Sequence, residues 1–258
     1  MEKIRVLFTG DSITDVYRTD VARVVEGWLP PTATAQERQA ATDSLLGMGY
    51  PLLAAAQLSA EEPGRYEFLN RGISGNRVVD LDARVKRDCI NLKPQVLSIL
   101  IGVNDVWHEL MEQNGVDAEK FRRVYQAMLE EIAAALPGLR LILLEPYVLP
   151  GPSTQPQWDD FRREVDLRRA AVRDLAAHME RRTGRPVACI DTQSLLDAAA
   201  AQSSPAVYTA DGVHPTPAGH WLLAQEWVRR FREGETGWTG KRTPCHAGRA
   251  FLSNQISP

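Results

Sequence analysis

Short apolar runs alternate along the chain with longer segments in which apolar residues recur every three or four positions. The short runs predict strands at residues 4–9, 66–70, 95–101, 139–144 and 187–190. The periodic segments predict helices at residues 50–58, 78–89, 119–135, 158–182, 192–200 and 217–232. Because strands that alternate with helices pair in parallel, we predict an α/β fold in which helices cover both faces of one sheet.

Two segments without a clear period determine the expected domain boundaries. We assign residues 1–233 to a single domain, a length that one hydrophobic core can support. Residues 29–44, rich in Pro, Thr, Ala and Gln, are expected to form an irregular polar insertion. Residues 234–258 are expected to form a C-terminal extension, either an intersubunit arm or a poorly ordered tail.

Composition and targeting signals narrow the possible functions. The net charge of −3 gives no reason to expect a nucleic acid or an anionic membrane as a partner. No run approaches the ~20 apolar residues of a membrane span, and the chain opens on a strand, so we expect a cytoplasmic protein. The cysteines are far apart and form no metal or redox motif, and no nucleotide-binding motif is present. We therefore expect neither a metal nor a cofactor.

Polar segments follow the first three predicted strands directly. They are residues 9–14, 70–76 and 102–105, and a fourth polar segment, 211–215, precedes the last predicted helix. Open parallel sheets bind ligands at the carboxyl ends of their strands. We therefore expect all four segments to meet at one edge of the sheet.

These four segments contain the parts of a serine hydrolase. The hydroxyl of Ser12 is a poor nucleophile unless a base takes its proton, and His214 is the best candidate base. Asp211 precedes this histidine by three residues and can orient its ring. We expect the developing oxyanion to be bound by the backbone N–H groups of Ser12 and Gly75 and by the side-chain amide of Asn104. A glycine suits position 75, because a side chain there would crowd the substrate.

The same segments resemble the sequence blocks of the SGNH (GDSL-like) hydrolases, in the same order and across most of the chain. The matching residues are Gly-Asp-Ser-Ile-Thr at 10–14, Gly75, Gly-Val-Asn-Asp at 102–105 and Asp-Gly-Val-His-Pro at 211–215. The resemblance implies a flavodoxin-like three-layer α/β/α sandwich with a five-stranded parallel sheet. It also implies the roles assigned above to the nucleophile, the triad acid and base, and the oxyanion donors.

Two stretches, residues 71–76 and 101–107, are similar to those of intracellular acetylxylan esterases, which remove acetyl groups from xylo-oligosaccharides. This resemblance implies a homo-oligomeric esterase that cleaves short acyl esters of carbohydrates through an acyl-enzyme. Two alternatives stay open. One is a lipid-directed acylhydrolase, such as a lysophospholipase, or a thioesterase of the same fold, and the other is a non-catalytic binding scaffold.

Further side chains near the predicted site have both a functional and a structural interpretation. Trp107, Tyr17 and Tyr147 follow strand ends and are candidates for lining the cleft, although core packing would explain Trp107 equally well. The other candidates are assigned structural roles: Ser74 in a turn, His220 in the last helix, Asp11 in the loop after the first strand, Asp105 beside Asn104, and His108 at the surface.

Overall fold

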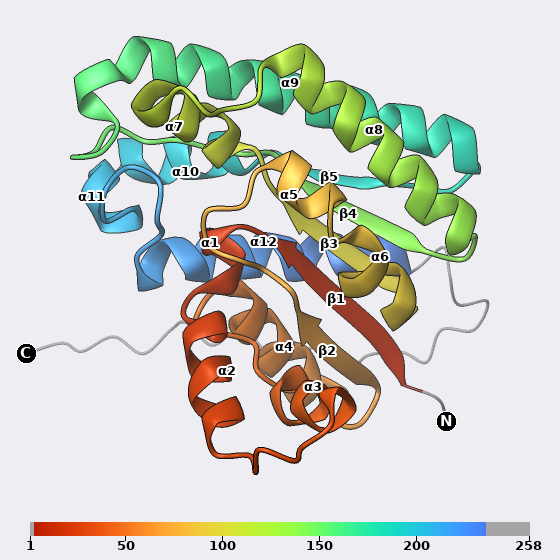
Figure 1. Cartoon of the computed structure of the whole chain (residues 1–258). Helices are drawn as coiled ribbons and strands as arrows, with labels where there is room; N and C mark the ends of the chain where they lie inside the picture. The colour runs from red at the N-terminus through yellow and green to blue at the C-terminus, as the bar shows by residue number, and fades with distance from the viewer. Residues whose placement is uncertain (1–2, 236–258) are drawn as a thin grey trace, which may run out of the picture.

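Five parallel strands form the centre of the structure, a computed structural model that describes residues 3–235. The strands are β1 (Ile4–Gly10), β2 (Tyr66–Asn70), β3 (Val96–Leu100), β4 (Arg140–Leu144) and β5 (Ala188–Ile190). All neighbours pair in parallel, in the order β2-β1-β3-β4-β5 (Figure 1). This is the strand order of flavodoxin-like sheets, so the predicted fold class is confirmed.

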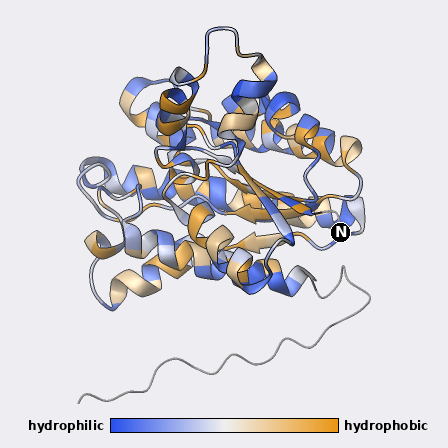
Figure 2. Cartoon of the chain, turned by 90° about the horizontal axis from the view of Figure 1, so that it is seen from below, coloured by the Kyte–Doolittle hydropathy of each residue, from blue (hydrophilic) through white to orange (hydrophobic). Residues whose placement is uncertain are grey.

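Helices cover both faces of the sheet, as the alternation of patterns predicted. The helices on one face are α4 (Tyr50–Glu61), α10 (Thr192–Ala201) and α12 (Pro217–Glu235). Those on the other face are α5 (Val78–Asp82), α6 (Val85–Asp88), α8 (Ala118–Ala135) and α9 (Trp158–Thr183). In Figure 2 the strands are predominantly hydrophobic, whereas the helices alternate between hydrophobic and hydrophilic residues. Within residues 3–235, no helix is both long and apolar enough to cross a membrane.

Successive residues of β1 pack against opposite helical layers, which explains the unbroken apolar run from Val6 to Phe8. Val6 and Phe8 face the layer of α4 and α12, and Leu7 faces the layer of α8 and α9. The ring of Phe8 lies 4.8 Å from that of Trp227, measured between centroids. The buried indole N–H of Trp227 donates to Ser98 Oγ on β3 at 2.9 Å, so the polar edge of this large side chain is satisfied inside the core.

Several helices were not predicted from the sequence. They are α1 (Ser12–Asp15), α2 (Arg18–Gly27), α3 (Ala35–Asp43), α7 (Val103–Glu112) and α11 (Pro205–Tyr208). The prediction of an irregular segment at residues 29–44 is wrong for its second half, which forms α3. Thr34 and Glu37 make a capping box at the start of this helix, since each accepts a hydrogen bond from the backbone N–H of the other.

Two further boundaries differ from the prediction. The helix expected at residues 78–89 is divided into α5 and α6, with Ala83 and Arg84 between them. The last helix, α12, continues to Glu235, so the expected domain boundary after residue 233 falls inside a helix. Residues 236–258 of the expected C-terminal extension lie outside the described residues.

Candidate active site

Ser12 lies two residues after the end of β1, at the first position of the short helix α1. Asp11 begins this helix, because its Oδ1 accepts a hydrogen bond from the backbone N–H of Ile13 at 3.0 Å. The expected loop-stabilising role of Asp11 is therefore confirmed, and burial raises the pKa of its carboxyl group to about 7. Gly10 allows β1 and β3 to end close together, since a Cβ on it would lie 2.1 Å from the carbonyl oxygen of Leu100.

The nucleophile, base and acid of the predicted triad are connected by hydrogen bonds. Ser12 Oγ lies 2.9 Å from His214 Nε2, and His214 Nδ1 lies 2.7 Å from Asp211 Oδ2. A carboxylate only accepts, so the ring donates from Nδ1 to Asp211, which leaves Nε2 to accept the proton of the serine hydroxyl. Ser12 and His214, which are 202 positions apart in the sequence, are thus in hydrogen-bond contact. The serine hydroxyl is the donor and the imidazole Nε2 the acceptor, as a general base requires.

The loop that carries Asp211 and His214 is fixed by its own hydrogen bonds. Asp211 Oδ1 accepts from the backbone N–H groups of Val213 at 2.9 Å and His214 at 2.8 Å. These bonds leave Oδ2 for the imidazole, so both carboxylate oxygens are used. The hydrogen bonds lower the pKa of Asp211 to about 2, although partial burial alone would raise it. The hydrogen bond to this carboxylate raises the pKa of His214 above its ordinary value of 6.5.

These pKa shifts predict the pH dependence of ester hydrolysis. We expect kcat/KM to rise with pH through an inflection above 6.5, because only neutral His214 can accept the serine proton. Asp211 stays ionised throughout that range. The free energy of unfolding depends on pH in the opposite direction. The hydrogen bond between protonated His214 and Asp211 stabilises the folded state fully below pH 6.5, and this stabilisation is lost as the pH rises through the raised pKa of His214. A pH–rate profile measured on a chromogenic ester checks this prediction, and an inflection below 6.5 contradicts it.

The three donors that the sequence predicted for an oxyanion site follow the carboxyl ends of β1, β2 and β3. No hydrogen bond within residues 3–235 occupies the backbone N–H of Ser12 or of Gly75. Gly75 has φ +81°, a conformation that favours glycine, and a Cβ on it would lie more than 4 Å from every other described residue except its two chain neighbours. Asn104 lies at the start of α7, and its Nδ2 donates to the carbonyl oxygen of Asn76 at 3.1 Å. An amide nitrogen has a second proton, which is free for a ligand.

A buried carboxylate that the sequence analysis missed connects the loop of Gly75 to helix α1. Asp15 Oδ2 accepts from the backbone N–H of Ser74 at 3.1 Å and from its hydroxyl at 2.9 Å. Arg18 donates to the carbonyl oxygen of Gly72 at 2.8 Å, which adds a second connection to the same loop. Ser74 is therefore a loop-anchoring residue and not a second nucleophile. Asp105 has a comparable role, because its carboxylate accepts from the N–H of Val78.

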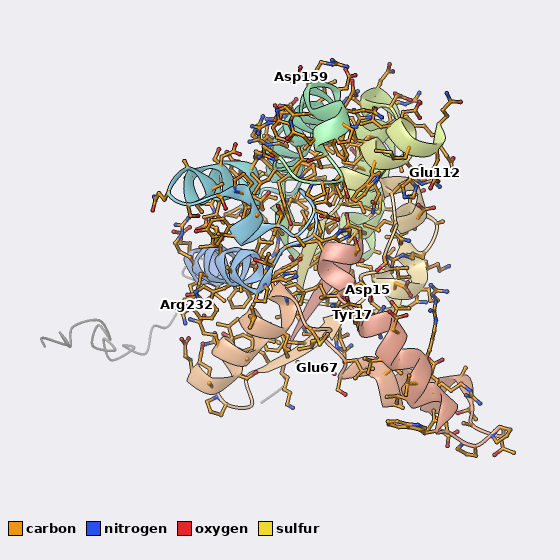
Figure 3. All side chains as sticks on the ribbon, turned by 90° about the vertical axis from the view of Figure 1, so that its left-hand side faces the viewer. Asp15, Tyr17, Glu67, Glu112, Asp159 and Arg232 are labelled. Carbon is orange, nitrogen blue, oxygen red and sulfur yellow. The ribbon has the colours of Figure 1, made fainter. Side chains whose placement is uncertain are left out.

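The three aromatic candidates for the cleft differ in position. Trp107 lies on α7, partly buried, with its ring 5.8 Å from that of His214 and 6.1 Å from that of Phe161. Tyr17 is 60% exposed and lies beside Asp15 at the sheet edge that carries the site (Figure 3). The prediction that Tyr147 lines the cleft is wrong, since its ring is fully buried and its hydroxyl donates to the backbone oxygen of Val213 at 2.9 Å.

His220 is structural, as expected. Its Nδ1 accepts from the backbone N–H of Tyr50 at 3.2 Å, and burial lowers the pKa of its imidazole to about 4. It therefore stays neutral where His214 titrates. Within the described residues, no group of three or more His, Cys, Asp or Glu side chains has the arrangement of a metal site.

Comparisons with known proteins identify the family of the chain. The chain matches the GDSL-like Lipase/Acylhydrolase family over residues 8–222, a span that includes the triad and all three donors. It is 30% identical over 232 residues to the acetylxylan esterase of Geobacillus stearothermophilus. The aligned region covers 88% of this chain and 93% of that protein.

Two solved structures extend the likeness to three dimensions. A GDSL-like lipase from Parabacteroides merdae superposes with a TM-score of 0.73 at 31% identity, over 89% of this chain and 95% of that one. The acetylxylan esterase Axe2 of Geobacillus stearothermophilus gives a TM-score of 0.67 at 29% identity, over 88% of this chain and 93% of that one. The chain therefore belongs to the GDSL-like lipase/acylhydrolase family, and it is a carboxylic ester hydrolase.

Proposed function

We propose that this protein is a serine esterase that removes acetyl groups from xylo-oligosaccharides or related acetylated carbohydrates. The observation that carries the proposal is the continuous chain of hydrogen bonds from Ser12 through His214 to Asp211. The substrate class is supported by the likeness to an acetylxylan esterase over most of both chains. A mutant of Axe2, the solved relative named above, is described as an acetyl-xylooligosaccharide esterase.

The acylation step follows from the positions of the three side chains. Ser12 Oγ attacks the ester carbonyl while His214 Nε2 takes its proton, and Asp211 stabilises the imidazolium that forms. The carbonyl oxygen becomes an oxyanion beside the N–H groups of Ser12 and Gly75 and the amide of Asn104. Each such donor, when present, contributes about 10²- to 10³-fold to kcat in enzymes of this type. The imidazolium then gives its proton to the leaving sugar alcohol.

Deacylation repeats the same chemistry with water. His214 takes a proton from a water molecule, which attacks the acetyl ester on Ser12, and the oxyanion forms again at the same donors. Proton return to the serine oxygen releases acetate. This sequence needs proton transfer and oxyanion stabilisation only, and the residues on this edge of the sheet provide both.

Two aromatic side chains, one in contact with the triad and one exposed, favour a small carbohydrate ester. The ring of Trp107 lies against His214, so it limits the space next to the scissile bond. Tyr17 presents an exposed ring near the same edge. Aromatic rings pack well against the apolar C–H faces of sugars, and a bulky indole beside the base favours an acetyl group over a long acyl chain.

A comparison of substrates tests this proposal. We expect release of acetate from acetylated xylo-oligosaccharides, and a kcat/KM for p-nitrophenyl acetate at least about tenfold above that for p-nitrophenyl octanoate, because the ring of Trp107 beside His214 restricts the room for a long acyl chain. Ser12→Ala protein provides the blank for each substrate. A preference for the octanoate ester, for lysophospholipids or for thioesters would contradict the proposed substrate class and favour a lipid-directed acylhydrolase or a thioesterase.

A further inference from the structure

The side chain of Arg84, between α5 and α6, is only 9% exposed and donates hydrogen bonds from all three guanidinium nitrogens. Its Nε donates to Asn76 Oδ1 at 2.8 Å. Its Nη1 donates to the carbonyl oxygen of Arg71 at 2.8 Å and to Asp88 Oδ2 at 2.9 Å. Its Nη2 donates to the carbonyl oxygen of Gly10 at 3.3 Å. One buried cation thus binds four oxygens from three separate parts of the chain: the end of β1, the loop after β2, and α6.

Three of these oxygens belong to the loops that carry the candidate site. Gly10 ends β1, two residues before Ser12, and Arg71 follows the end of β2. Asn76 directly follows Gly75, the residue whose N–H is proposed to bind the oxyanion. Arg84 therefore connects the loop of the nucleophile with the loop of an oxyanion donor.

Asn76 extends this connection to the third donor. Its side-chain oxygen accepts from Arg84, and its backbone oxygen accepts from Asn104 Nδ2 at 3.1 Å. The orientation of the Asn104 amide is therefore linked to Arg84 through a single residue. A shift of Asn76 would move the N–H of Gly75 and the amide of Asn104 together.

We propose that Arg84 is a positioning residue for ester hydrolysis, and that it keeps the N–H of Gly75 and the side-chain amide of Asn104 in fixed positions relative to Ser12. This inference rests on the proposed function of the site. Arginine is suited to this role because its planar guanidinium directs several donors into fixed, diverging directions, whereas lysine provides a single flexible ammonium. Asp88 neutralises the buried charge, so that the remaining donors are available to neutral oxygens.

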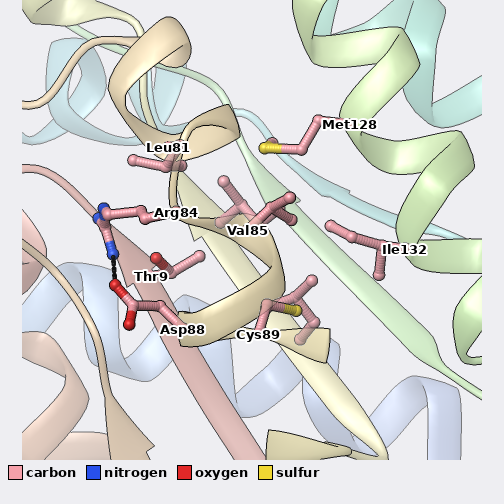
Figure 4. Close-up of a pocket in the computed structure, with 10 residues that line it drawn as sticks. Thr9, Leu81, Arg84, Val85, Asp88, Cys89, Met128 and Ile132 are labelled. Carbon is pink, nitrogen blue, oxygen red and sulfur yellow. Dashed lines mark hydrogen bonds and ion pairs between the residues drawn. The ribbon is translucent and has the colours of Figure 1, made fainter. Parts of the chain in front are cut away.

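The surroundings of Arg84 guide the choice of replacements. Figure 4 shows the Arg84–Asp88 pair at the edge of a small cavity, whose other walls include Leu81, Val85 and Met128. An aliphatic side chain at position 84 would face these apolar walls. We therefore use Arg84→Met, which keeps most of the volume, and Arg84→Lys, which keeps the charge beside Asp88.

Arg87 is a matched control, because it also forms an ion pair with Asp88. Its Nε lies 2.7 Å from Asp88 Oδ1, its side chain is 73% exposed, and no hydrogen bond joins it to the site loops within residues 3–235. Arg87→Met therefore removes one arginine from the same carboxylate and leaves the loops in place. We expect its kcat and KM to stay within about twofold of wild type, as for other surface substitutions.

We expect Arg84→Met to lower kcat about 10- to 100-fold with little change in KM, since a misplaced donor affects the transition state more than substrate binding. Arg84→Lys should lose activity to a smaller extent. The rate at which a fluorophosphonate labels Ser12, and the affinity for a boronic acid that forms a tetrahedral adduct, should fall in parallel with kcat. A merely structural role would not change these two readouts in a protein whose circular dichroism is native.

The inference is overturned if both Arg84 variants keep the wild-type kcat, or if kcat falls while phosphonate labelling and boronate affinity stay unchanged. An increase in KM alone also contradicts it. If Arg84→Met does not fold, Arg84→Lys decides the question by the same readouts. Failure of the wild-type protein to be labelled at Ser12 would instead contradict the proposed function, independently of Arg84.

Discussion

Replacement of Ser12 by alanine is expected to lower kcat by about 10⁴-fold or more, the usual effect of removing the nucleophile of a hydrogen-bonded triad. Ser12 Oγ is the atom that forms the acyl-enzyme, and it lies 2.9 Å from the proposed base. Alanine leaves His214 paired with Asp211 but removes the attacking oxygen. The donors at Gly75 and Asn104 then remain without a covalent intermediate to stabilise.

Steady-state rates on p-nitrophenyl acetate and labelling by a fluorophosphonate measure this effect. Ser203→Ala is the activity control, because Ser203 is exposed and its hydroxyl bonds only to the backbone oxygen of Ala199 among the described residues. Ser74→Ala tests the rival serine: we expect that variant to accept the label at Ser12. Near-wild-type turnover in Ser12→Ala, or loss of the label in Ser74→Ala alone, would rule out the proposed nucleophile.

The second large effect is expected for Asp211→Asn, with kcat reduced about 10⁴-fold. The charge of Asp211 stabilises the imidazolium, and its two oxygens hold the ring of His214 and the backbone N–H groups of the loop. The side chain of asparagine has only one oxygen. If this oxygen faces the ring, the backbone N–H groups lose their acceptor; if it faces the backbone, the NH₂ group faces the ring. In the second case the ring must accept at Nδ1, and Nε2 then carries the proton and cannot serve as base.

The pH profile separates this effect from a general loss of stability. Because the hydrogen bond to Asp211 raises the pKa of His214, we expect the inflection of the residual activity to move to lower pH in Asp211→Asn. Asp160→Asn is the matched control, since Asp160 pairs with Arg163 at the same spacing of three residues on the exposed surface. An Asp211→Asn protein with an unchanged inflection would contradict the assignment of Asp211 as partner of the base.

The fold was predictable from the sequence where local periodicity decides it. Buried strands have continuous apolar runs and the long helices have an apolar stripe, so the sheet and its two layers follow from pattern alone. The capping box of Thr34 and Glu37 was also present in the sequence, as a Thr and a Glu three residues apart, and would have indicated α3. It was hidden by the Pro- and Thr-rich composition around it.

The errors in the site come from rules that ignore packing. Tyr147 follows a strand end, as a cleft residue would, but its ring is in the core and its hydroxyl holds the backbone of Val213. Trp107 follows a strand end as well, and its ring contacts both Phe161 and His214, so both interpretations of this residue describe part of its surroundings. The direction in which a side chain leaves the backbone depends on the elements around it, and spacing after a strand does not determine that direction.

The sequence by itself determined the order of the elements and the pairing of Asp211 with His214, because both depend on residues close together along the chain. It also indicated Ser12, through the meeting of strand ends at one sheet edge and through the family resemblance. Only the tertiary structure decided which groups hold the loops in place. Asp15 and Arg84 act in part on backbone N–H and carbonyl groups, which every residue has, so no residue type at a fixed spacing marks these backbone partners.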